Sequence, residues 1–199
     1  DKISIPKNLV AKIPDGVDLK DASFATIASI AINGFRCANP ELGHSVVVIG
    51  LGLIGLLTVQ VAKAAGCKVI GIDLDERKVN LALELGADHA YTRSENNLTA
   101  ILELTNHIGV DSVIITAAGD SNDSIKLAGK ITRKKAIISI IGNIKLDIPR
   151  EDFYKKELSV QIPSSYGPGR YDRNYEEHGH DYPVGFVRWT ISRNMHTAL

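Results

Sequence analysis

Residues 46–55 read VVVIGLGLIG, an apolar run that leads directly into three glycines spaced as G-x-G-x-x-G. The run Val46 to Ile49 is β-branched and has the length of a buried strand. Residues 53–65 continue with helical apolar spacing, and Gly66 follows as a helix-ending residue. A glycine string of this kind carries weight only between a strand and a helix. The stretch therefore predicts a strand, a tight turn and a helix in succession.

The same alternation of β-branched runs and helical stretches continues along the chain. Further strands are predicted at residues 68–73, 88–92, 111–117, 136–141 and 158–163. Helices are predicted at about 76–85, at 98–106, and from a cap at Ser121 to Ile131. This order predicts an α/β fold, a doubly wound, mainly parallel six-stranded sheet of the dinucleotide-binding (Rossmann) kind with helices on both faces.

Each glycine of the motif has a distinct physical role in such a fold. Gly50 permits the tight turn, Gly52 lets the backbone approach a pyrophosphate, and Gly55 allows the helix to pack closely on the strand. The pyrophosphate would lie on the free N–H groups of the helix that begins near Leu53. The alternative is a glycine-rich turn without a ligand.

An acidic residue, Asp73, ends the second predicted strand, where a dinucleotide site places a carboxylate about 20 residues after the first glycine. A carboxylate there accepts hydrogen bonds from the adenosine ribose and repels the 2′-phosphate of NADP, so we expect NAD as the cofactor. Asp75 is an alternative acid or a helix cap, and Arg77 and Lys78 would soften the discrimination if they turned towards the ribose.

Small residues follow the fourth and fifth predicted strands, at 117–119 and 141–143. They leave room for the nicotinamide ribose at the carboxyl ends of the strands, or they form ordinary turns. The predicted cofactor-binding residues are Gly50, Leu51, Gly52, Leu53, Ile54, Gly55, Asp73, Leu74, Ala117, Ala118, Ile141 and Gly142.

Composition excludes several other classes of protein. The 199 residues carry 23 basic and 23 acidic side chains, and 44% are hydrophobic, as in an ordinary globular protein. We therefore expect no nucleic-acid partner. The longest apolar stretch, residues 46–65, is too interrupted for a membrane span. Only Cys37 and Cys67 occur, which excludes a disulfide framework and favours a reducing, cytoplasmic location.

The flanks of this body differ from it. We expect a lead-in segment and helix at residues 1–40, an NAD-binding domain at 41–165 and an aromatic-rich tail at 166–199, which holds six of the chain's eleven aromatic residues. Because the first residue is Asp1 and no signal sequence precedes it, we expect a chain cut from a longer protein or processed.

The order of segments resembles the cofactor-binding domain of the medium-chain, zinc-type alcohol dehydrogenase family. The resemblance covers residues 1 to about 165 and rests on these features: the small-residue helix 22–38, GLGLIG at 50–55, Asp73 with ERK at 76–78, LGAD at 85–88, GVD at 109–111 and IG at 141–142. The tail, with SSYGPGRY at 164–171, YP at 182–183, VRWT at 187–190 and RNM at 193–195, is similar to members associated with bacterial surface-polysaccharide gene clusters, in which a second oxidoreductase half can be fused.

The resemblance implies an NAD-dependent dehydrogenase that transfers a hydride between nicotinamide and an alcohol or carbonyl carbon. It also implies that the family's other domain, which supplies catalytic zinc ligands or their replacements, lies mainly before this chain. We therefore expect no catalytic or metal-ligating residue here, zinc only in the missing domain, and a chain that is inactive alone. Cys37 and Cys67 are interpreted as structural thiols, and the pair His178 and His180 as a solvated loop.

Other interpretations stay open from the residues alone. The tail residues Tyr166, Arg170, Tyr171 and Arg188 would form a substrate anion site or, more simply, contacts to the absent domain or a partner. We expect the tail to be poorly ordered or paired with another molecule. The chain could also be a non-catalytic dinucleotide sensor or an S-adenosylmethionine methyltransferase, whose fold places similar glycines and an acid. The substrate is not identified, and a homodimer is left open.

Overall fold

The computed structural model describes residues 2–199, so Asp1, on which the expectation of a longer parent rests, lies outside the described residues. By its internal contacts the chain divides into two compact units, residues 34–162 and residues 1–33 with 163–199. The predicted three-part division therefore differs from this grouping, in which the lead-in and the tail belong to one unit. That the tail faces an absent domain stays a prediction.

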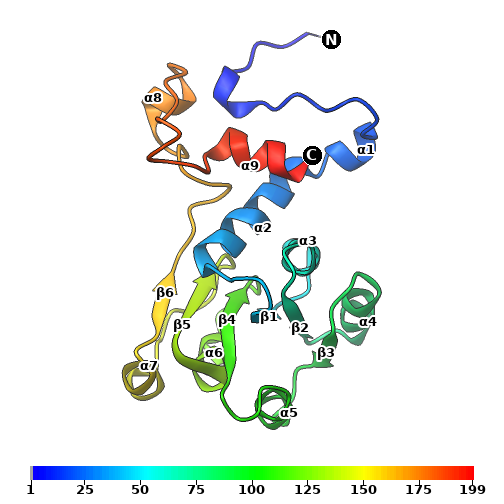
Figure 1. Cartoon of the computed structure of the whole chain (residues 1–199), viewed down its shortest axis with the longest axis vertical. Coiled ribbons are helices and arrows are strands. Elements are labelled where there is room, and N and C mark those ends of the chain that lie inside the picture. The colour runs from blue at the N-terminus through cyan, green and yellow to red at the C-terminus, as the bar shows by residue number, and fades with distance from the viewer. Residues whose placement is uncertain (1) are drawn as a thin grey trace. The chain divides into compact units, whose positions relative to one another are not determined.

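The larger unit is built on one parallel sheet of six strands (Figure 1). The strands are β1 (Ser45–Ile49), β2 (Lys68–Asp73), β3 (His89–Thr92), β4 (Val110–Ile115), β5 (Thr132–Ile140) and β6 (Ser159–Gln161). Their order in the sheet is β3-β2-β1-β4-β5-β6, and every pairing is parallel. The predicted doubly wound sheet is confirmed.

Helices cover both faces of this sheet because successive strand residues are apolar on alternate sides. Val47 and Ile49 face a core shared with α5 (Asn97–Leu104), α6 (Asp123–Ile131) and α7 (Arg150–Lys156). Val46 and Val48 face a second core, shared with the end of α2 (Ala25–Ala38) and with α3 (Leu53–Ala64) and α4 (Glu76–Glu84). Burial on both faces explains why the strand sequences are continuous apolar runs.

Two elements depart from the sequence-based boundaries. The fifth strand begins at Thr132, immediately after α6, and not at Ala136. Its polar first residues pair with β4 around an irregularity at which Lys135 has a positive φ of 59°. Helix α7 was not predicted, and its last residue, Lys156, donates from Nζ to three backbone oxygens at the end of α6 at 2.7 to 2.8 Å.

The smaller unit joins the two ends of the chain. It contains the 3₁₀ turn η1 (Lys7–Leu9), α1 (Leu19–Ala22), the first part of α2, α8 (Arg173–Glu176) and α9 (Ile191–Ala198). Figure 1 shows the blue N-terminal segment beside the orange and red C-terminal segment. Tyr175 is fully buried, and the Asn8 amide donates to its carbonyl oxygen at 2.9 Å.

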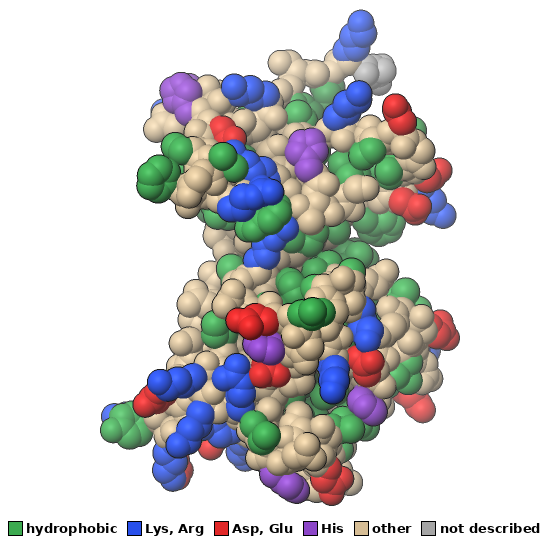
Figure 2. Space-filling model, viewed as in Figure 1, with side chains coloured by type: hydrophobic (Ala, Val, Ile, Leu, Met, Phe, Trp, Pro, Cys, Tyr) green, Lys and Arg blue, Asp and Glu red, His purple; other side chains and the backbone are tan. Residues whose placement is uncertain are grey.

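The tail therefore packs, through its buried side chains, with the N-terminal segment of the same chain. That the tail is poorly ordered or paired with another molecule stays a prediction. Tyr171 and Phe186 remain 74% and 90% exposed. Among residues 2–199, no helix has the length and apolar character that crossing a membrane requires. Figure 2 shows cationic, anionic and apolar side chains interspersed over the visible face.

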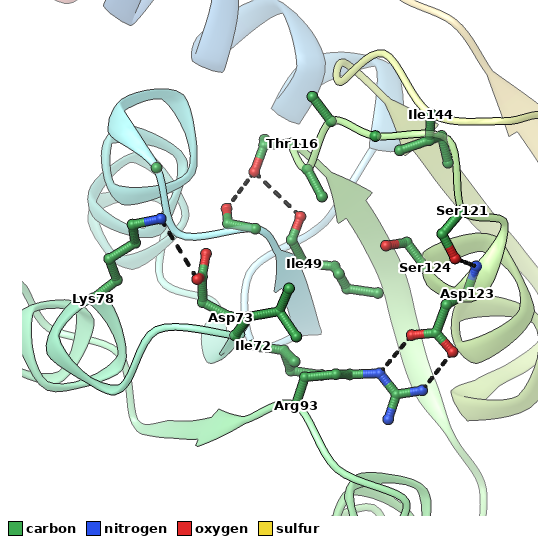
Figure 3. Close-up of a pocket in the computed structure, with 16 residues that line it drawn as sticks. Ile49, Ile72, Asp73, Lys78, Arg93, Thr116, Ser121, Asp123, Ser124 and Ile144 are labelled. Atoms are coloured by element: carbon green, nitrogen blue, oxygen red, sulfur yellow. Dashed lines mark hydrogen bonds and ion pairs between the residues drawn. The ribbon is translucent and has the colours of Figure 1, made fainter.

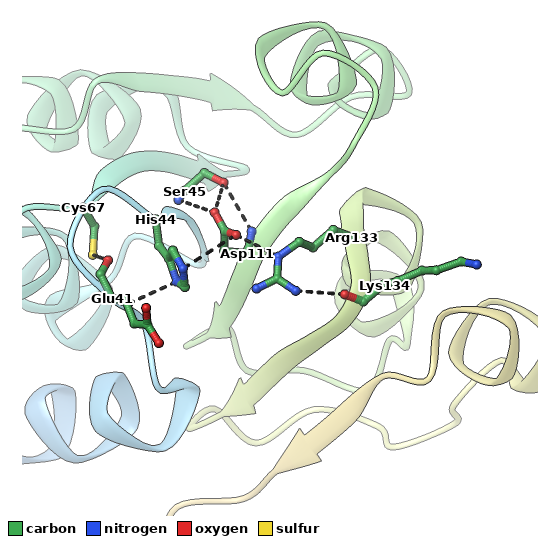
Figure 4. A network of polar contacts seen from close by, with 7 residues as sticks. All are labelled: Glu41, His44, Ser45, Cys67, Asp111, Arg133 and Lys134. Atoms are coloured by element: carbon green, nitrogen blue, oxygen red, sulfur yellow. Dashed lines mark hydrogen bonds and ion pairs between the residues drawn. The ribbon is translucent and has the colours of Figure 1, made fainter.

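A polar cluster joins three strands at the amino ends of β1 and β4 (Figure 4). One carboxylate oxygen of Asp111 accepts from the backbone N–H and the hydroxyl of Ser45 at 2.7 and 2.8 Å, and the other accepts from Arg133 Nε at 2.8 Å. The Asp111 side chain is 23% exposed. Partial burial raises its pKa, but the hydrogen bonds from Arg133 and Ser45 outweigh this, and the pKa is lowered.

We predict that Asp111→Asn lowers the free energy of unfolding by about 2 kcal/mol at neutral pH, because a charge-assisted bond and a buried acceptor are lost. A carboxyl group with a lowered folded-state pKa contributes its stability above its unfolded value of 3.8 and loses it as the pH falls through the folded value. The stability difference between the two proteins should therefore persist at pH 5 to 7, roughly the usual range of maximal stability, and narrow below about pH 3.8.

Denaturant unfolding at a series of pH values measures this difference. Glu151→Gln is the matched control, because Glu151 forms an exposed ion pair with Lys155 within one helix and its loss should leave stability almost unchanged. If the difference in unfolding free energy between Asp111→Asn and the unmodified protein does not narrow below about pH 3.8, the assigned role of the Asp111 carboxylate is contradicted.

Candidate functional site

A cavity of about 470 Å³ in the residue 34–162 unit lies at the carboxyl ends of β1, β2 and β4 (Figure 3). In sheets of this strand order, the connections that follow β1 and β4 leave in opposite directions along the sheet. A crevice forms between them at this edge, and ligands bind there. Six of the predicted cofactor-binding residues line the cavity: Gly50, Gly52, Asp73, Leu74, Ala117 and Ala118.

The turn after β1 is held by backbone contacts that only glycine allows. Gly50 has a φ of 97°, and a Cβ there would lie 2.5 Å from the backbone nitrogen of Ala117. A Cβ on Gly55 would lie 1.9 Å from the Gly50 oxygen. The Thr116 hydroxyl donates to that same Gly50 oxygen. These approaches fix the path of the turn against the end of β4.

Gly52 differs from its neighbours in that a Cβ built on it would meet no atom within 4 Å. It is the N-cap of α3 and offers no side chain to the N–H groups of the first helical turn. Those N–H groups have no acceptor within the helix, and they carry the positive end of the helix dipole. Gly52 therefore lines an open cradle that is suited to an anionic group.

Asp73 is held in place at the end of β2 and is only 11% exposed. One carboxylate oxygen accepts from the backbone N–H of Leu51 at 2.6 Å, and the other accepts from the N–H of Asp75 at 2.9 Å. Because a carboxylate offers about four lone-pair positions, both oxygens keep capacity for hydroxyl donors. Asp75 itself caps α4 through the N–H of Arg77 and does not line the cavity.

The other six predicted residues do not line the cavity. Leu51 is fully buried in the core, Leu53 is 51% exposed, and Ile54 and Gly55 belong to the first turn of α3. Ile141 and Gly142 follow β5, and their backbone N–H groups donate to the Ile115 oxygen at 2.8 and 3.0 Å. The close approach of Gly55 to Gly50 is the helix-to-strand packing expected of that glycine. That these six residues contact the cofactor stays a prediction.

The cavity wall also contains residues that the sequence analysis did not assign to the cofactor site, namely Arg93, Ser121, Asp123, Ser124 and Ile144. Arg93 directly follows β3, which lies beside β2 in the sheet. Its position after a predicted strand could therefore have identified it as a residue of the site. The residues at the start of α6 had no such signal. Lys78, considered only as a modifier, also lines the cavity, and its Nζ lies 3.6 Å from Asp73 Oδ1.

The tail residues considered for an anion site are engaged within their own segment. Arg170 pairs with Glu176 and lies 4.1 Å over the Tyr171 ring, and Arg188 lies 4.0 Å over the Trp189 ring. Within residues 2–199, no three or more His, Cys, Asp or Glu side chains come together as metal ligands. Cys67 is buried, with its Sγ 3.7 Å from the Glu41 oxygen.

Comparisons with known proteins agree with this geometry. A family model described as zinc-binding dehydrogenase matches residues 54–177. Galactitol 1-phosphate 5-dehydrogenase of Escherichia coli strain K12 is 26% identical over 164 residues, which are 79% of this chain and 47% of that protein. The chain thus spans about half the length of the curated relatives it matches.

Solved structures show the same relationship. Alcohol dehydrogenase TADH from Thermus sp. ATN1 is 28% identical with a TM-score of 0.69, covering 78% of this chain and 46% of that one. The alcohol dehydrogenase rspB from E. coli CFT073, complexed with the cofactor NADH, is 28% identical with a TM-score of 0.68, covering 77% and 46%. With its parallel sheet and glycine turn, the chain belongs to the zinc-binding dehydrogenase family and contains the Rossmann domain of a medium-chain, zinc-type member.

Proposed function

We propose that this chain is the NAD(H)-binding domain of a dehydrogenase that transfers a hydride between nicotinamide and an alcohol or carbonyl substrate. The observation that carries the proposal is the open cradle at Gly52, beside an almost buried carboxylate that keeps free lone pairs. An anion-binding helix end next to a hydroxyl acceptor is the pair of features that a dinucleotide requires.

Different residues of the cleft bind different parts of the cofactor. The turn at Gly50 to Gly52 and the first N–H groups of α3 hold the pyrophosphate, and Asp73 accepts from the adenosine ribose. Ala117 and Ala118, at the end of β4, leave space for the nicotinamide half. When bound, the nicotinamide supplies the carbon that accepts or donates the hydride.

The described residues do not fit a zinc ion, because no cluster of three or more metal-ligating side chains occurs among residues 2–199. The proposed function is therefore derived without zinc. The alcohol or carbonyl substrate is supported by the relatives' activities, since one is named for galactitol 1-phosphate and another for alcohols. A cytoplasmic location, a homodimer and inactivity of the chain alone stay predictions.

Gly52→Val should weaken NADH binding by more than about tenfold without loss of folding, because the new side chain fills the cradle and its Cβ has no protein atom within 4 Å. Gly185→Val is the matched control, since a Cβ there also meets nothing within 4 Å. NADH fluorescence titration measures binding, and thermal unfolding confirms that both variants fold. Normal NADH binding by Gly52→Val would place the phosphates elsewhere.

The same titration of the unmodified chain separates the competing functions. We expect NADH to bind and S-adenosylmethionine not to compete. A chain that binds S-adenosylmethionine and no NADH would refute the proposal in favour of the methyltransferase interpretation.

Asp73→Asn should raise the NADH dissociation constant and shift the NADPH to NADH affinity ratio towards NADPH by about tenfold, because the lost charge both accepts from the ribose and repels phosphate. The affinity ratio is the informative readout, since a loosened turn would weaken the binding of both cofactors equally. Calorimetry with each reduced cofactor measures it. Tighter NADPH than NADH binding by the unmodified chain would contradict the assignment of NAD.

A further inference from the structure

Two cationic side chains, Lys78 and Arg93, line the same cleft as Asp73. The backbone N–H of Arg93 donates to the backbone carbonyl oxygen of Asp73 at 2.8 Å, because Arg93 follows the β3 residue that pairs with Asp73. On the proposed function, this is the end of the cleft that receives the adenosine ribose. The cleft therefore contains an arginine directly after the strand that lies beside β2, in the same cavity that would receive a 2′-phosphate on that ribose.

Each nitrogen of the Arg93 guanidinium nevertheless donates to an acceptor of the protein (Figure 3). Its Nε and one terminal nitrogen donate to the two oxygens of Asp123, each at 2.8 Å, and its other terminal nitrogen donates to the Ser94 oxygen. The Arg93 side chain is 22% exposed. This parallel, two-point geometry is the one that guanidinium groups also use to hold phosphate.

Asp123 comes from a different part of the sheet edge, the first turn of α6. Its backbone N–H donates to the Ser121 hydroxyl at 3.1 Å, and its own side chain is 54% exposed. A carboxylate in that position has two effects on an arriving phosphate. It occupies the guanidinium N–H groups of Arg93 that would bind the phosphate. Its negative charge also lies on the same cavity wall and repels the phosphate.

Lys78 is a weaker candidate for the same role. Its Nζ lies 3.6 Å from a single oxygen of Asp73, and its side chain is 46% exposed. Removal of Asp73 to release Lys78 would also remove the ribose acceptor and the anchor of the Leu51 N–H. Release of Arg93 by removal of Asp123 leaves both of these intact.

We propose that Asp123 is a second specificity-determining carboxylate, which excludes the phosphorylated cofactor by holding Arg93 in a bidentate ion pair. This inference rests on the proposed NAD(H) function and deepens it. Selectivity then depends on two carboxylates from opposite halves of the sheet: Asp73 is a contact to the ribose, and Asp123 sequesters the cation that would otherwise favour NADP.

The test compares Asp123→Asn with the unmodified chain in titrations of NADH and NADPH. The variant should bind NADPH about tenfold more tightly than the unmodified chain and NADH within about twofold, because one charge-assisted phosphate contact becomes available. Competition by 2′,5′-ADP should improve to the same extent, and competition by 5′-ADP should not.

Two further variants make the result specific. Asp147→Asn removes an exposed carboxylate that accepts from Asn122 just before α6 and does not line the cleft, so NADPH binding should not change. The double variant Arg93→Gln with Asp123→Asn should lose the gain. The inference is overturned if Asp123→Asn leaves NADPH affinity unchanged, if Asp147→Asn gives the same gain, or if the gain persists without Arg93.

The outcome also separates this inference from the proposed function. A chain that binds NADH, but whose Asp123→Asn variant does not gain NADPH affinity, refutes only the role of Asp123. An unmodified chain that binds no nicotinamide dinucleotide refutes the proposed function and this inference together.

Discussion

The close approach of three backbone turns at the carboxyl edge of the sheet is the constraint on which the site depends. Side chains at Gly50 and Gly142 would come within 2.5 and 1.8 Å of the Ala117 backbone, and one at Gly55 within 1.9 Å of Gly50. The turns after β1, β4 and β5 therefore pack without intervening side chains. This packing directs the N-terminus of α3 into the cleft. Gly52, the other glycine of the motif, lines the cleft, and a Cβ there would meet no atom within 4 Å.

Charge in the cleft is balanced by pairing. Lys78 lies beside Asp73 and Arg93 is bound by Asp123, so each of these cations faces a carboxylate. The attraction for a pyrophosphate then comes mainly from the N–H groups and dipole of α3, which act over one turn of helix. This arrangement favours a ligand whose negative charge lies at the glycine turn, and it disfavours extra charge near the ribose.

The two compact units differ in how they are stabilised. The sheet unit has apolar cores on both faces, in which most side chains of β1, β2 and β4 are buried. In the smaller unit the buried Tyr175 accepts a hydrogen bond from Asn8 at its carbonyl oxygen, and its ring stacks on that of Tyr182. Segments from both ends of the chain are needed to cover Tyr175, so neither end forms this unit alone.

The sequence by itself determined the sheet, the glycine turn and the Asp73 position, because β-branched runs, helical periodicity and glycine spacing are local properties of the chain. The predicted start of the fifth strand at Ala136 was wrong, because the polar residues after Ile131 already belong to β5 and Thr132 pairs with β4. Only the tertiary structure brought Arg93 and Asp123 together, placed Lys156 over the end of α6 and joined the tail to the N-terminal segment. Each of these contacts links residues that are distant in the chain, and no periodicity or spacing records which distant side chains a fold makes neighbours.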